Sequence, residues 1–355
     1  MSWNHLVRFG GTVAATAFCM SAYAASGVVA SISVDKQSLG PADDLVVKVT
    51  LTNTTSTPQR LLKWQTPFGP ITESLFDVSR DGVPVAYEGK HVKRPAPRAS
   101  DYFTIQPGKS HTASVELSSL YDLSASGDYA IRFVAIGPES APTTKGASSA
   151  AKSAPVGEDD DLVKSEAVTV WIEGSNLRKS APAPEGEGLT FTSCSASQQS
   201  SINAAFSAAK TMANGTVSYL NAGTRGTRYT KWFGTYDATR YNTVKSHFAN
   251  IKNALDTKPV NVDCSCTDSY YAYVYPTQPY KIYVCNAFWS APTSGTDSKG
   301  GTLVHETSHF NVVAGTDDWA YGQSAAASLA TSNPSRATDN ADSHEYFSEN
   351  TTALP

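Results

Sequence analysis

Cysteine, methionine and charged residues are all scarce in this chain of 355 residues. It has 5 cysteines, 3 methionines and 17% charged residues, with a formal net charge of −4 and no cluster of lysine and arginine. A surface that neutralises nucleic-acid phosphates needs such a cluster, so we expect no nucleic-acid partner. The hydrophobic share of 40% is sufficient for a buried core and excludes a wholly disordered chain.

Long apolar runs are also missing. The run from Gly10 to Met20 is shorter than the roughly 20 residues that a membrane-spanning helix needs. It follows Arg8 and precedes Ala22-Tyr23-Ala24, a small-x-small cleavage pattern, so residues 1–24 are predicted to be a secretory signal peptide. We therefore expect a secreted, extracellular protein without a membrane segment, and the loss of Cys19 with the signal.

The remaining cysteines are unevenly distributed. All four lie after residue 190: Cys194, Cys264, Cys266 and Cys285. Export makes them natural disulfide partners. Because the chain also exceeds the roughly 100–200 residues of an ordinary domain, we predict two parts with different needs for stabilisation. These are a first domain over residues 25–174 and a second over 190–355, joined by a linker at 175–189.

Short alternating or β-branched runs, separated by turn residues, fill the first part. They lie at 28–34, 45–51, 76–78, 113–117 and 129–134, with one more strand at 166–172. This pattern predicts an all-β, immunoglobulin-like antiparallel sandwich with Greek-key connections. Residues 138–161 are rich in alanine, serine and proline and end in an acidic run. We expect them to form a flexible stretch.

The second part has a different pattern of residues, which predicts a mostly helical α+β domain. Apolar residues at helical spacing predict helices over 195–220, 237–255, about 301–313, 317–331 and 338–349. Asp237 is a plausible N-cap of the second helix. Tyr270–Tyr275 and Tyr280–Cys285, joined by four residues, predict a hairpin.

His305-Glu306-Thr307-Ser308-His309 is the strongest chemical motif. Residues four apart face the same way on a helix, so both imidazoles can bind one metal ion. Glu306 can then reach a metal-bound water as a general base. The apolar neighbours of the motif fit a buried active-site helix. We therefore predict one catalytic Zn²⁺ here, in preference to a structural histidine pair.

A catalytic zinc site needs a third protein ligand and an open position for water. The metzincin continuation fails, because Gly315 stands where that pattern requires histidine. Gly315-Thr316 breaks the helix soon after His309, which brings Asp317 or Asp318 within reach of the metal. A glutamate from a later helix, with Glu345 the best placed, is the alternative.

The motif His305-Glu306-x-x-His309 followed by Gly315-Thr316-x-Asp318-x-x-Tyr321-Gly322 resembles the deuterolysin, or aspzincin, metallopeptidases. The resemblance covers about residues 190–355 and implies a zincin-type protease domain. It implies Asp318 as the third ligand and Tyr321 as the hydroxyl that stabilises the oxyanion. It also implies two disulfide bonds, Cys194–Cys264 and Cys266–Cys285.

Within that family, the tail at residues 339–347 looks closest to the peptidyl-Lys metalloendopeptidases. These enzymes cleave on the N-terminal side of lysine, and the resemblance gives the lysine pocket to Asp342 and Glu345. Residues three apart share one helix face and suit an ammonium, although two solvated carboxylates near a helix start show the same spacing. His344 lies between them as a bystander. The hairpin at 270–285 is either an edge for extended substrate or a tyrosine-rich core hairpin.

Residues 25–189 stand where members of this family carry a pro-region. We therefore expect the sandwich to be an intramolecular inhibitor of a monomeric protease that acts on proteins or peptides, with Lys179 as a maturation site. A permanent binding module is the alternative for this part. For the whole chain, the alternatives are a deuterolysin-like protease without strict lysine preference, and a secreted binding protein with a structural zinc site.

Overall fold

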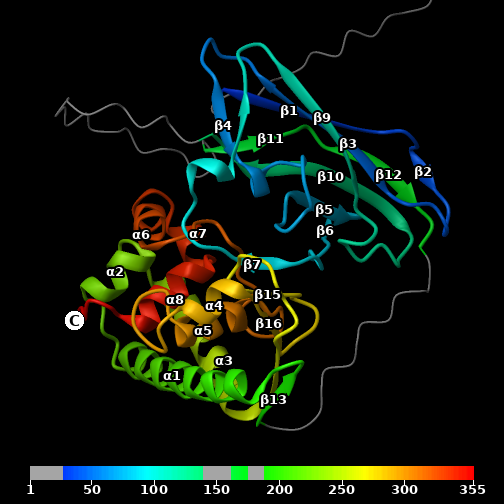
Figure 1. The fold of residues 1–355 in the computed structure, drawn as a ribbon. Helices are drawn as coiled ribbons and strands as arrows, with labels where there is room; N and C mark the ends of the chain where they lie inside the picture. Colours follow the sequence, from blue (N-terminus) through cyan, green and yellow to red (C-terminus); the bar gives the residue numbers. More distant parts are fainter. Residues whose placement is uncertain (1–26, 139–160, 175–187) are drawn as a thin grey trace, which may run out of the picture.

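The computed structural model of the protein describes residues 27–138, 161–174 and 188–355, which form two parts in contact with each other (Figure 1). The predicted signal peptide, nearly all of the predicted flexible stretch, Lys179 and most of the linker lie outside the described residues. Within the described residues, no helix has both the length and the apolar character needed to cross a membrane.

The first part is a β-sandwich, as predicted, and its strands pair antiparallel except β2 (Ser38–Leu39), which pairs parallel with β12 (Val168–Ile172). One sheet has the order β1-β3-β9, with β1 at Val28–Val34, β3 at Val46–Asn53 and β9 at Ser110–Glu116. The other has the order β2-β12-β10-β5-β6, with β10 at Gly127–Ile136, β5 at Phe76–Arg80 and β6 at Val83–Pro84. Strand β11, Leu162–Lys164, also pairs with β10. Alternate residues of β10, among them Tyr129, Ile131 and Phe133, are buried in the core, as the period of two requires.

Shorter elements connect this sandwich to the second part. Strands β4 (Gln59–Leu62) and β8 (Tyr102–Ile105) form a separate two-stranded sheet. Two 3₁₀ turns lie at Lys63–Gln65 and Ala99–Asp101. Between them runs strand β7, His91–Lys93, which leaves the sandwich altogether.

The second part contains a five-stranded sheet and most of the helices. The sheet has the order β13-β14-β16-β15-β7, with β13 at Gly188–Thr192, β14 at Pro259–Asp263, β16 at Lys281–Val284 and β15 at Ala272–Val274. The helices are α1 (Ala196–Asn221), α2 (Thr227–Phe233), α3 (Ala238–Thr257), α4 (Asn286–Ser290), α5 (Lys299–His309), α6 (Gln323–Ser332), α7 (Pro334–Thr338) and α8 (Ala341–Glu349). As predicted, Asp237 caps α3 by accepting a hydrogen bond from the backbone of Arg240 at 2.9 Å.

The hairpin prediction is confirmed, and the hairpin edge is occupied. Strands β15 and β16 pair antiparallel. On its other side β15 pairs antiparallel with β7, so a strand from the first part completes the sheet of the second (Figure 1). Residues His91–Lys93 therefore lie in the second part although the sequence places them within the sandwich.

Three of the predicted helix boundaries are wrong. Helix α5 ends at His309 rather than near residue 313, and α6 begins at Gln323 rather than at 317. The backbone of Asp317 instead bridges to Asn340 and its neighbours, which holds residues 317–322 in a non-helical path. The side chain of Asn340 accepts hydrogen bonds from two backbone amides of that path, and Asn340 is the N-cap of α8, which begins at Ala341 rather than at 338. Tertiary contacts thus override the local helical pattern.

Two disulfide bonds connect the elements of the second part. Cys194–Cys264 links the start of α1 to the end of β14, and Cys266–Cys285 links the following loop to the start of α4. These are the two pairs that the family resemblance implies.

Candidate metal centre

Helix α5 carries the H-E-x-x-H motif through the middle of the second part, and every residue of it is buried. Ser298 caps the helix by accepting a hydrogen bond from the backbone of Gly301 at 2.9 Å. A side chain at Gly301 would collide with Glu349, since a Cβ there would lie 2.1 Å from a carboxylate oxygen of that residue. The glycine therefore lets α8 approach α5 closely.

His305, His309 and Asp318 come together as three metal-ligand atoms. The two Nε2 atoms lie 3.1 Å apart, and the Asp318 carboxylate oxygens lie 3.3 Å from His305 and 3.4 Å from His309. Metal–ligand bonds of about 2.0–2.1 Å in a tetrahedron separate the ligand atoms by about 3.3–3.4 Å. Both Asp318 oxygens are buried without a hydrogen-bond partner. The three side chains therefore fit a tetrahedral metal ion with one further position.

Neighbouring groups orient the two imidazoles. His309 Nδ1 lies 2.6 Å from the Thr316 carbonyl oxygen, to which it donates, so its Nε2 is the acceptor atom. His305 Nδ1 lies 2.9 Å from Asp342 Oδ1, which orients that ring in the same way. Although burial opposes ionisation of Asp318, His309 and His305 hold the pKa of its carboxyl well below its usual range. The Nε2 atoms of both histidines thus face an ionised carboxylate.

The other predicted ligands lie elsewhere. Asp317 faces His91, with its Oδ1 at 3.7 Å from His91 Nε2, and its carboxylate makes no contact with the histidine pair. Glu345 approaches His305 at Nδ1 (3.4 Å), the nitrogen that faces away from the metal position. Of the three carboxylates, Asp318 is the one whose oxygens lie within 3.4 Å of the Nε2 atoms of both His305 and His309.

Glu306 and Tyr321, the two predicted catalytic residues, are both buried. Both carboxylate oxygens of Glu306 are buried without a hydrogen-bond partner, and burial raises the pKa of its carboxyl to about 8. The hydroxyl of Tyr321 lies 3.0 Å from the carbonyl oxygen of Val92 and 2.8 Å from Glu73 Oε1. The Glu306 carboxyl is therefore buried without a partner, and the Tyr321 hydroxyl lies at hydrogen-bond distance from a backbone carbonyl oxygen.

Asp342 and Glu345 on α8 form a closed anionic pocket beside His305. Lys93 fills it, with its Nζ at 3.2 Å from Asp342 and 2.6 Å from Glu345, and all three side chains are at most 1% exposed. Burial opposes charge on Lys93, yet the two carboxylates hold its pKa above the usual range. The side chains of His305, Asp342 and Glu345 match the geometry of a cation site. The cation beside them here is the Lys93 ammonium. His344 faces His247 at 3.0 Å instead of the pocket.

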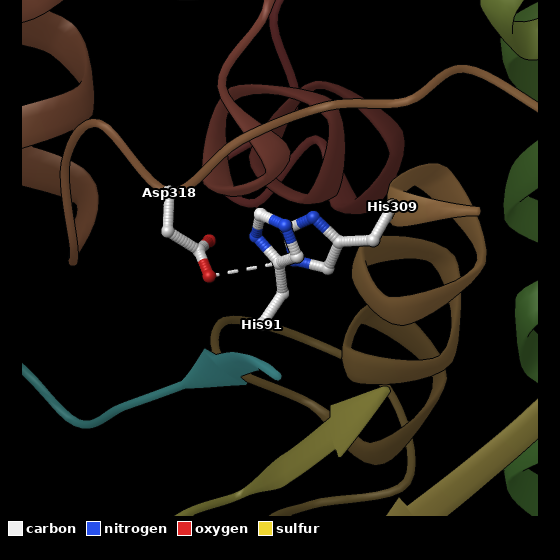
Figure 2. Close-up of side chains that lie close together, drawn as sticks. All are labelled: His91, His309 and Asp318. Atoms are coloured by element: carbon white, nitrogen blue, oxygen red, sulfur yellow. Dashed lines mark ion pairs between the residues drawn. The ribbon is translucent and has the colours of Figure 1, made fainter. Parts of the chain in front are cut away.

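Several residues of this site were missed by sequence reasoning, and all belong to the first part. His91, Lys93, Arg94 and Glu73 reach the cluster from the sandwich side. Figure 2 shows the imidazole of His91 stacked on that of His309, beside the Asp318 carboxylate. Neither a motif nor a hydrophobic period marks this three-residue strand, so the sequence carries no signal for it.

A buried helix with two histidines four apart, a carboxylate ligand and an unpaired glutamate defines a metal-dependent hydrolase of the H-E-x-x-H class. Comparison with known proteins is more specific. Residues 218–349 match the aspzincin M35 family, described as lysine-specific metallo-endopeptidase. This chain belongs to the aspzincin M35 family and is a metallo-endopeptidase.

Relatives match nearly the whole chain. It is 48% identical over 321 residues to the extracellular protease of Aeromonas hydrophila, covering 88% of this chain and 90% of that protein. It is 38% identical over 356 residues to the peptidyl-Lys metalloendopeptidase of Armillaria mellea, covering 94% and 96%. Among solved structures, the zinc peptidase from Grifola frondosa is 49% identical and covers 46% of this chain and 100% of that chain, with a TM-score of 0.45.

Proposed function

We propose that this protein is a secreted zinc endopeptidase that hydrolyses the peptide bond on the N-terminal side of lysine. It is made as a precursor in which residues 25–174 cover the site and residues 190–355 carry it. The observation that carries the proposal is the burial of a lysine ammonium between two carboxylates beside the metal cluster. Export is supported by the two disulfide bonds and by a relative named extracellular protease.

Preference for lysine follows from the chemistry of the pocket. Asp342 and Glu345 are buried and share one compact cation at 2.6–3.2 Å. A neutral side chain would leave two buried carboxylates without a partner, which costs several kcal/mol. A planar guanidinium needs a wider fork of acceptors than this point-like ammonium site offers. Sites with such buried polar groups reject ligands that lack the partner group by about 10⁴-fold.

The edge of strand β15 would hold the substrate backbone. In the present structure this edge pairs with β7 in the register Ala272–Lys93, Tyr273–Val92 and Val274–His91. An extended peptide in that register places a lysine side chain in the pocket and the preceding carbonyl group at Tyr321. Pairing along an edge strand contributes affinity, and the pocket contributes specificity.

His305, His309 and Asp318 would hold the ion, and an N₂O set in a tetrahedron suits Zn²⁺. Zinc, when bound, lowers the pKa of a bound water and polarises the scissile carbonyl group. Glu306 takes the proton from the attacking water and passes it to the leaving amine. Tyr321 donates a hydrogen bond to the carbonyl oxygen as negative charge develops there.

The test is cleavage of peptides that differ at one position, lysine against arginine, methionine or alanine. We expect the matured enzyme to cut before lysine alone, and activity to fall by about 10²–10⁴-fold in Glu306→Gln. A chelator should abolish cutting. Asp268→Asn changes an exposed carboxylate of the same domain and serves as the matched control. Equal cutting before all four residues would support the unspecific deuterolysin-like alternative, and no cutting would support a binding protein with structural zinc.

A further inference from the structure

Strand β7 lies in the active site as a substrate would. Its backbone pairs with the edge of β15, Lys93 fills the anionic pocket, and the carbonyl oxygen of Val92 lies 3.0 Å from the Tyr321 hydroxyl. The peptide bond presented to the catalytic groups is therefore Val92–Lys93. In the proposed function this is a bond of the preferred type, so some feature of the structure must protect it from hydrolysis.

His91 is the residue placed to give that protection. It is 3% exposed, its Nδ1 is buried without a hydrogen-bond partner, and its ring stacks on His309 with the centroids 4.7 Å apart. One of its ring nitrogens lies within 4.8 Å of the ligand atoms of His309 and Asp318 (Figure 2). A buried nitrogen without a partner is costly, and a metal ion between these side chains would supply one.

We propose that His91 is a fourth protein ligand of the metal in the uncut chain. It closes the coordination position that the attacking water needs, and the chain thereby holds its own Val92–Lys93 bond in the site unhydrolysed. This inference rests on the proposed function. A metal with four protein ligands is closed, as in structural zinc sites, whereas a catalytic site keeps one position open.

Glu73 supports the same state at Tyr321. The phenol has one hydrogen, and two acceptors compete for it: Glu73 Oε1 at 2.8 Å and the Val92 carbonyl oxygen at 3.0 Å. Glu73 Oε1 is the nearer of the two acceptors. Arg94 pairs with Glu73 and also donates to the Tyr321 oxygen at 2.8 Å. The hydroxyl is thus held by the first part of the chain and withdrawn from the carbonyl group it would stabilise.

Removal of His91 should convert this internal inhibitor into a substrate. Water then adds to the Val92 carbonyl carbon, the bond to the Lys93 nitrogen breaks, and Glu306 carries the proton from the water to that nitrogen. The products are a carboxylate at Val92 and a free amine at Lys93. No reactant other than water is consumed.

The first experiment measures the metal rather than activity. The full chain is prepared with Glu306→Gln, so that it stays intact, and loaded with Co²⁺. We expect His91→Ala to shift the visible absorption bands of the Co²⁺ and to speed metal loss to a chelator by at least about tenfold. His111→Ala, an exposed histidine of the same part, is the control. Unchanged bands and an unchanged release rate in His91→Ala would overturn the assignment of His91 as a ligand.

The second experiment follows the bond itself. The zinc-loaded full chain with His91→Ala and an intact Glu306 should be cut between Val92 and Lys93, which fragment masses detect. Addition of Lys93→Met should abolish that cut. A folded, metal-bound His91→Ala chain that stays intact at this bond would overturn the protective role. External lysine peptides, offered to the matured enzyme, test the proposed function separately, because their cleavage does not involve His91.

Discussion

At the scale of single residues, Asp342 contacts the lysine pocket, the metal centre and the backbone at once. Its Oδ1 contacts both Lys93 (3.2 Å) and His305 Nδ1 (2.9 Å), and its Oδ2 accepts a hydrogen bond from the backbone of Gly322 at 2.7 Å. Glu345 contacts Lys93 more closely, at 2.6 Å, but lies further from His305, at 3.4 Å. One carboxylate therefore joins the pocket to the metal centre, and the other serves mainly the pocket.

This difference predicts two distinct phenotypes in the matured enzyme. Glu345→Gln should raise KM for lysine peptides and leave metal affinity nearly unchanged. Asp342→Asn should raise KM and also weaken metal binding by about 10–100-fold, because it removes the carboxylate that orients His305. Kinetics and competition with a chelator measure the two effects, with Asp268→Asn as control. Equal metal affinities in the two variants would contradict the division of tasks.

At the scale of elements, helix α5 is held between α1 and α8. A Cβ at Gly300 would lie 3.0 Å from Ala208 on α1, and one at Gly301 would lie 2.1 Å from Glu349 on α8. Two consecutive glycines therefore allow the motif-bearing helix to be approached from two sides. The predicted helix at about 301–313 includes His305, Glu306 and His309, as α5 does. Its end at His309 depends on tertiary contacts that the local pattern does not contain.

Substitution of glycines tests this packing. Gly301→Ala should lower the free energy of unfolding by about 1–3 kcal/mol, because the Glu349 carboxylate has to move and gives up its hydrogen bonds from Ser298. Gly215→Ala on α1 should do the opposite and raise it by about 0.5–1 kcal/mol, since nothing lies within 4 Å of the added carbon. Denaturant unfolding of the two variants measures both values. A neutral Gly301→Ala would contradict the close approach of α5 and α8.

Helices α3 and α8 meet through a histidine pair, in which His344 is buried and His247 half-buried. His344 Nδ1 lies 2.9 Å from the Asn340 carbonyl oxygen, to which it donates, so its Nε2 accepts the proton of His247 Nδ1 at 3.0 Å. Burial lowers the pKa of His247 to about 4 and that of His344 to about 3. Burial therefore keeps both imidazoles uncharged at neutral pH.

This pair predicts a loss of stability on acidification. Below the usual histidine pKa of 6.5, these two histidines bind protons in the unfolded chain but not in the folded one. The stability that the neutral pair contributes to the folded state above pH 6.5 is therefore lost between pH 6.5 and about 3. The stability advantage of the wild type over His247→Ala should therefore shrink as the pH falls from 7 to 4.5. Thermal unfolding across that range measures it, and the exposed His111→Ala should show no such trend. A constant difference would rule out the mechanism.

At the scale of the whole molecule, the disulfide bonds and the H-E-x-x-H motif belong to the same part. Cys194–Cys264 closes a loop with a sequence separation of 70, and Cys266–Cys285 one of 19. In the chain-entropy account such loops contribute about 4 and about 3 kcal/mol. The cysteine-free sandwich has no such constraint. Within the described residues, covalent cross-links therefore constrain only the part that carries the H-E-x-x-H motif.

Removal of the longer bridge tests that distribution. Cys194→Ser combined with Cys264→Ser should lower the unfolding free energy of the second part by about 4 kcal/mol, because its unfolded state gains chain entropy. Unfolding in denaturant, with reduced and oxidised wild type as references, gives the value. A loss below about 1 kcal/mol would contradict a stabilising role for this bridge.

The sequence by itself determined what depends on local spacing. Helical periodicity puts His305 and His309 on one face of α5. It likewise puts Asp342 and Glu345 on one face of α8, independently of the rest of the chain. Alternation likewise predicted the sandwich strands. Only the tertiary structure separates Asp317 from Asp318: next to the bridge between Asp317 and Asn340, Asp317 faces His91 and Asp318 faces His305. It also brought Lys93 to Asp342, 249 residues away, through a strand too short to leave a pattern. Pairing of distant strands depends on the packing of whole layers, which no local period records.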